Sequence, residues 1–140
     1  MGTRYFSLIV GLLFLLAGLL GFVPGFVAAP MGAPPLVVDS GYGLLFGLFP
    51  INVLHNIVHL LIGVWGIVAW RRFASARTFS KSLAVIYGVL AVMGLIPILN
   101  VTFGYIPLFG HDIWLHALTA IAAAYFGFAP VRAPTEPALR

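Results

Sequence analysis

The sequence predicts an all-α polytopic membrane protein, a four-transmembrane-helix bundle that forms a single membrane domain over residues 1–140. Hydrophobic residues make up 62% of the chain and charged residues only 7%, whereas a typical soluble domain is about 45–50% apolar and about 25% charged. The apolar residues gather in four long runs, and the basic residues lie outside those runs. Too few charges remain to cover a water-facing surface, which excludes a soluble globular enzyme and a disordered chain.

The four apolar runs define the expected transmembrane helices. They cover about residues 5–28, 51–70, 83–99 and 112–129, and roughly 20 apolar residues suffice for a helix to cross the hydrocarbon core. Each run is continuous, whereas the strands of a membrane β-barrel alternate over about ten residues. Small residues inside the runs, such as Gly11, Gly63 and Gly66, predict positions of close contact between helices.

Three segments lie outside the predicted spans. Residues 30–50, which are rich in proline and glycine, predict an extracytoplasmic loop that folds back on the membrane surface with a short helix near residues 43–49. Residues 71–82 predict a basic cytoplasmic loop, and residues 131–140 a cytoplasmic tail.

All seven basic residues fall on one side of the predicted bundle, at Arg4, Arg71, Arg72, Arg77, Lys81, Arg132 and Arg140. Loops rich in Lys and Arg stay in the cytoplasm, so we expect both termini to lie there and the protein to reside in a bacterial inner membrane. The formal charge of +4 then reflects topology, and no nucleic-acid partner is expected. The expected partners are the lipid bilayer and other membrane subunits or a second copy of the chain.

Polar residues cluster at the outer ends of the second and fourth spans. On the second span, four polar residues follow one another at intervals of three, one and three, so they share one helical face. They are Asn52, His55, Asn56 and His59. On the fourth span, Asp112 and His116 are four residues apart and also share a face. Because polar groups within a membrane usually turn toward the bundle interior, these six residues are the candidate site.

The residues alone leave several interpretations of this site open. A structural network would join the spans by hydrogen bonds, as in an accessory subunit of a membrane complex. A transition-metal site would use His55, His59, His116 and Asp112 as ligands, with Asn52 and Asn56 supporting them. Haem b would use His59 and His116 as axial ligands, and a proton or solute pathway would use the titrating histidines.

Of these interpretations, the network is the favoured one. Gly63 and Ala120 lie one turn below His59 and His116, and small residues suit helices too close for a large cofactor. The chain has no cysteine and no phosphate-binding loop or nucleophile elbow. We therefore expect no catalytic residues and favour a non-enzymatic role.

The sequence resembles a family of small bacterial four-span integral membrane proteins of unknown function. Three motifs carry the resemblance, which covers roughly residues 4–130: the segment from Phe49 to Gly63, the segment from Tyr87 to Gly94, and the segment from Asp112 to His116. In such proteins the Asn, the His and the Asp-x-x-x-His elements recur at these places. His111, directly before Asp112, departs from the pattern and takes no role from it. The resemblance implies the four-span fold and no particular activity.

Overall fold

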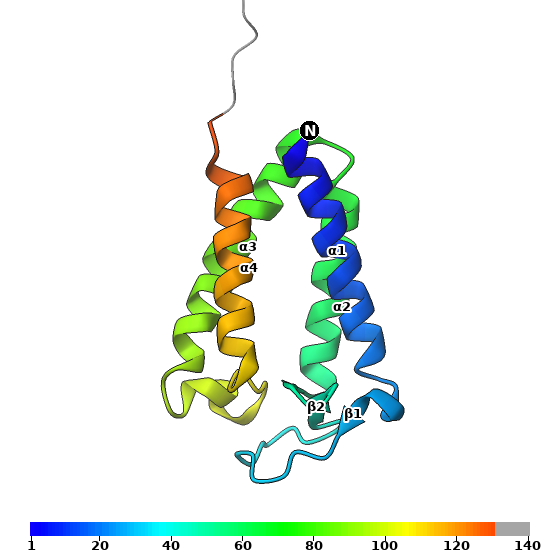
Figure 1. Cartoon of the computed structure of the whole chain (residues 1–140), viewed down its shortest axis with the longest axis vertical. Coiled ribbons are helices and arrows are strands. Elements are labelled where there is room, and N and C mark those ends of the chain that lie inside the picture. Colours follow the sequence, from blue (N-terminus) through cyan, green and yellow to red (C-terminus); the bar gives the residue numbers. More distant parts are fainter. Residues whose placement is uncertain (131–140) are drawn as a thin grey trace, which may run out of the picture.

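The computed structural model describes residues 1–130, which fold into four main helices and a small three-stranded sheet. The helices are α1 (Gly2–Leu20), α2 (Val53–Ala69), α3 (Phe73–Gly94) and α4 (His111–Phe128). Helix α1 packs along α2, and α3 packs along α4. The two hairpins lie closest together at the end that carries the N-terminus and diverge toward the sheet (Figure 1).

Helices α1 and α2 meet through glycine, as the small residues predicted. A Cβ atom added at Gly11 would lie 2.8 Å from the backbone nitrogen of Ile67, and one added at Gly63 would lie 2.7 Å from the backbone nitrogen of Leu15. The buried hydroxyl of Ser7 donates a hydrogen bond of 2.8 Å to the carbonyl of Gly66. Glycine therefore permits the two backbones to come into direct contact.

The hydrophobic core joins the two hairpins near the N-terminal end of α1. It contains Phe6 of α1, Ala69 of α2, Phe79, Leu83 and Tyr87 of α3, and Ala123 of α4. Phe6 also stacks on Phe126, with 4.6 Å between the ring centroids. All four helices therefore contribute side chains to one core, although each hairpin is the more closely packed unit.

Helix α3 begins about ten residues before the predicted third span, so the predicted basic loop at 71–82 is mostly helical. Ala76, Phe79 and Ser80 are fully buried, and the side chain of Arg77 donates a hydrogen bond of 2.9 Å to the carbonyl of Gly127. Tertiary contacts thus stabilise a helical conformation in the polar stretch 73–82, which its low hydropathy predicted to be a loop. Helix α1, in contrast, is shorter than the predicted first span of residues 5–28, because it ends at Leu20, ahead of Pro24.

The segment between α1 and α2 is a sheet where a short helix was predicted, so the expectation for residues 43–49 was wrong. After a 3-10 turn, η1 (Pro24–Phe26), strands β1 (Val27–Ala28), β2 (Gly43–Leu45) and β3 (Phe49–Ile51) pair antiparallel in that order. The chain reverses at Phe46 and Gly47, which both have positive φ, the conformation typical of hairpin turns. Backbone pairing satisfies the amides of a segment too short and glycine-rich for a helix.

A second 3-10 segment, η2 (Leu99–Gly104), connects α3 to α4. Within the described residues, α1 and α3 are long and apolar enough to cross a membrane, and α2 is a shorter apolar helix.

Candidate functional site

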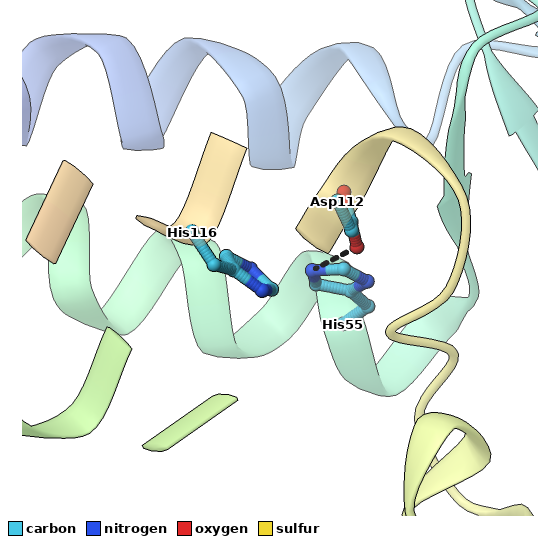
Figure 2. A group of neighbouring side chains, drawn as sticks. All are labelled: His55, Asp112 and His116. Carbon is cyan, nitrogen blue, oxygen red and sulfur yellow. Dashed lines mark ion pairs between the residues drawn. The ribbon is translucent and has the colours of Figure 1, made fainter. Parts of the chain in front are cut away.

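Three of the predicted site residues converge where the N-terminal ends of α2 and α4 face one another. His55 comes from α2, and Asp112 and His116 come from α4 (Figure 2). Each residue is only 3% exposed. One ligand atom from each lies within 4.8 Å of the other two, and His55 Nε2 lies 3.9 Å from Asp112 Oδ2. We call these three residues the buried triad.

Local structure places each member of the buried triad. Asn52 caps α2, and its side-chain oxygen accepts a hydrogen bond of 2.9 Å from the backbone nitrogen of His55, the usual geometry of a helix N-cap. Gly110, with φ of 64°, turns the chain into α4 so that Asp112 lies in the first turn. His116 follows four residues later and therefore projects from the same face of α4.

Three side-chain polar atoms of the buried triad lack hydrogen-bond partners. His55 Nδ1, His116 Nδ1 and Asp112 Oδ2 are buried, and each is without a partner among the described residues. An unsatisfied buried polar group costs about 1–3 kcal/mol, and native proteins keep few of them. The three residues that carry these atoms therefore form one buried polar cluster.

His59 lies beside the buried triad but outside its compact group of ligand atoms. Its ring packs against those of His55 and Phe14, at centroid distances of 4.5 and 5.1 Å. Tyr87 contacts His116 edge-on, with 4.9 Å between the ring centroids. Aromatic rings of the protein therefore pack beside both predicted haem ligands.

The two asparagines of the predicted polar face have different positions. Asn52 Nδ2 donates hydrogen bonds of 2.8 and 2.6 Å to the carbonyls of Val38 and Tyr105, so Asn52 anchors the outer segments. Asn56 is buried with both amide atoms unpartnered. It lines a separate pocket of about 300 Å³ bordered by Gly21, Ser40 and Tyr42.

His111, which departs from the family pattern, lies at the surface. It is exposed, and its Nδ1 accepts a hydrogen bond of 2.8 Å from the indole nitrogen of Trp114.

A cleft of about 340 Å³ runs from the buried triad between α1 and α4. Asp112, His116 and His59 line one end, and apolar side chains such as Val10 and Phe14 line the rest. The cleft's outer edges include Leu13 and Leu118, which are 60% and 57% exposed. A buried polar end and an apolar body that opens sideways are thus combined in one cavity.

Sequence reasoning assigned no role to Tyr87 or Phe14, although both line this cleft. Tyr87 is fully buried and lies on the same face of α3 as Leu83 and Ala91. The spacing of four residues between these three positions could have indicated that Tyr87 faces the interior. Phe14 had no signal, because it is one of many apolar residues on α1.

The charged side chains of the described residues are separated by sign along the bundle. Arg4 donates a hydrogen bond of 2.8 Å to the carbonyl of Trp70, Arg77 contacts Gly127, and Lys81 lies over the ring of Phe128. These contacts place the basic residues at the end of the bundle opposite the buried triad (Figure 1). The carboxylate of Asp112 therefore has no Lys or Arg near it within residues 1–130.

Comparison with known proteins gives one match. The chain matches the family described as a domain of unknown function (DUF4383) over residues 4–129. No curated protein and no solved structure matches it.

Proposed function

The chain belongs to the DUF4383 family, a domain of unknown function, and from this premise we propose that it is an integral membrane protein that binds a divalent transition-metal ion at the buried triad. The observation that carries the proposal is that one ligand atom from each of His55, Asp112 and His116 converges in a buried cluster. Within that cluster, one nitrogen of each histidine and one oxygen of the carboxylate have no hydrogen-bond partner among the described residues.

The membrane part of the proposal is supported by the surface of the helices. Large apolar side chains are exposed along all four, including Ile9 and Leu16 on α1, Leu61 on α2, Val89 on α3 and Ile121 on α4. Contiguous apolar surface on this scale marks contact with lipid or another protein. Basic residues at one end and Asp39 and Asp112 toward the other favour four spans with cytoplasmic termini in a bacterial inner membrane.

The metal part is supported by the type and spacing of the ligands. Two imidazoles and one carboxylate are a donor set that zinc and iron(II) accept. Ligand atoms about 2.1 Å from zinc lie about 3.4 Å apart in a tetrahedral site. The ligand atoms of the triad are at most 4.8 Å apart. Side-chain rotations that shorten these distances by about 1.4 Å would bring the three atoms around one ion.

The alternatives receive less support from the same geometry. A self-sufficient hydrogen-bond network would satisfy its own donors and acceptors, whereas the triad leaves three atoms unpartnered. Haem would need space for a macrocycle between His59 and His116, whereas Phe14 and Tyr87 pack beside these two rings. A role as an accessory subunit of a membrane complex is compatible with a bound metal and stays a prediction.

Metal analysis of the purified protein tests the proposal. We expect about one zinc or iron ion per chain in the wild type, and loss of that ion in His55→Ala, Asp112→Asn and His116→Ala, because three ligands barely suffice for tight binding. The matched control is His111→Ala, which removes an exposed histidine one residue from the triad and should keep the ion. Wild type that is metal-free after growth with ample zinc and iron would overturn the proposal.

A further inference from the structure

The cleft between α1 and α4 begins directly beside the buried triad, and apolar side chains line most of it. We propose that it binds a long-chain carboxylic acid, such as a free fatty acid, with the carboxylate at the metal and the chain along the cleft. This inference rests on the proposed function, because it takes the metal at the triad and the bilayer around the helices as given.

The shape of the cleft fits a single chain. On α4 its lining extends from Asp112 to Ala122, which is about 15 Å along the helix at 1.5 Å per residue. On α1 it extends from Ala17 to Phe6, where the stacked rings of Phe6 and Phe126 join the two helices. The cleft is therefore a groove parallel to the helix axes. Polar side chains line one end of it, and apolar side chains line the rest of its length.

The direction of the groove matches the orientation of a lipid. Its polar end lies at the outer ends of α2 and α4, and its apolar part extends toward the middle of the bundle. The exposed leucines Leu13 and Leu118 border the opening, so a chain enters from the side. A molecule already dissolved in the bilayer with its head at the interface reaches the site without turning over.

The net charge of the metal site determines which lipid head group it binds. A divalent ion held by Asp112 and two neutral imidazoles leaves one net positive charge, since ligating histidines are neutral. No Lys or Arg of the described residues lies nearby, and a buried uncompensated charge is unfavourable. A monoanionic carboxylate neutralises the site and supplies an oxygen ligand for the metal's open position. An uncharged head of the same size neutralises nothing.

Native mass spectrometry of the zinc-loaded full chain, released from a neutral detergent, tests the inference with palmitic acid and hexadecanol. We expect a one-to-one palmitic acid complex that is about tenfold tighter than the hexadecanol complex, the difference a charge-assisted contact produces. Leu118→Trp and, on the opposite wall, Leu13→Trp should lose palmitic acid and retain zinc. Leu61→Trp changes an equally exposed leucine of α2 outside the cleft and should bind both as wild type does.

The readouts separate the two proposals. Zinc bound without palmitic acid, equal binding of acid and alcohol, or unchanged binding in both cleft variants would overturn this inference and leave the metal site standing. A wild type that takes up neither zinc nor iron(II) would overturn the metal site, and this inference with it.

Discussion

Both amide groups of the Asn52 side chain are hydrogen-bonded, and their partners lie on three different segments. Its side chain caps α2 through His55 and donates to the carbonyls of Val38, in the segment before α2, and Tyr105, after α3. Asn52 is completely buried, so none of these contacts can be replaced by water without rearrangement. One residue thus ties the outer segments of both hairpins to the helix that presents His55.

Replacement of Asn52 by alanine should destabilise the protein by about 2–4 kcal/mol, because it removes an N-cap worth about 1 kcal/mol and leaves two carbonyls without their donor. The measurement is the free energy of unfolding in mixed detergent micelles. Asn100→Ala is the control, since no side-chain hydrogen bond of Asn100 is present in the described structure, and it should stay within about 0.5 kcal/mol of wild type. Equal stability of the two variants would refute the anchoring role.

The packing of helix α1 against helix α2 depends on glycine residues at their contact. Gly11 faces the backbone of Ile67 and the carbonyl of Gly63, and Gly66 faces the carbonyl of Ser7. Helices that approach this closely gain backbone van der Waals contacts. If the protein spans the membrane as proposed, such contacts take the place of the hydrophobic effect in holding the helices together. This packing sets the position of α2 and therefore of His55.

The variants Gly11→Ala and Gly88→Ala should differ sharply in stability. A Cβ at Gly11 would lie 2.8 Å from a backbone nitrogen, whereas one at Gly88 would lie 3.9 Å from its nearest neighbour, Ala120 Cβ. We expect Gly11→Ala to cost about 1–3 kcal/mol through overpacking. Gly88→Ala should be neutral or stabilising by up to about 1 kcal/mol, because alanine favours helix. Unfolding titrations of both variants provide the test, and a harmless Gly11→Ala would contradict the close helix contact.

Charge is distributed asymmetrically over residues 1–130. Arg4, Arg71, Arg72, Arg77 and Lys81 gather at the end where the hairpins converge, and the sheet lies at the other end (Figure 1). If the protein spans the membrane as proposed, this asymmetry determines its orientation, because basic segments resist translocation.

Cysteine labelling at two exposed serines tests that orientation. In the cysteine-free background, Ser40→Cys near the sheet should react in intact cells with a reagent that cannot cross the membrane. Ser75→Cys, at the basic end, should react only after the cells are opened. The reverse pattern would invert the topology, and labelling of both sites from outside would show that the chain does not span the membrane with this arrangement.

Much of the candidate site could be predicted from spacing along the helices. The interval of four residues places Asp112 and His116 on one face of α4 regardless of tertiary packing, and the polar character of that face turns it away from the apolar surface. The same spacing argument placed Asn52 and Asn56 beside His55, yet Asn52 became the cap of α2 and Asn56 lines a different pocket. Spacing cannot distinguish a residue inside a helix from one that begins it.

The sequence by itself determined the four apolar helices, the glycines at their contacts and the set of polar residues from which the site is drawn, because these depend on composition and helical period alone. Only the tertiary structure decided that His55 rather than His59 completes the buried triad, that α3 begins at Phe73, and that residues 43–51 pair as strands. Each of these outcomes depends on how one element is rotated and positioned against another. That choice is made by the summed packing of side chains from all four helices, which no local sequence pattern contains.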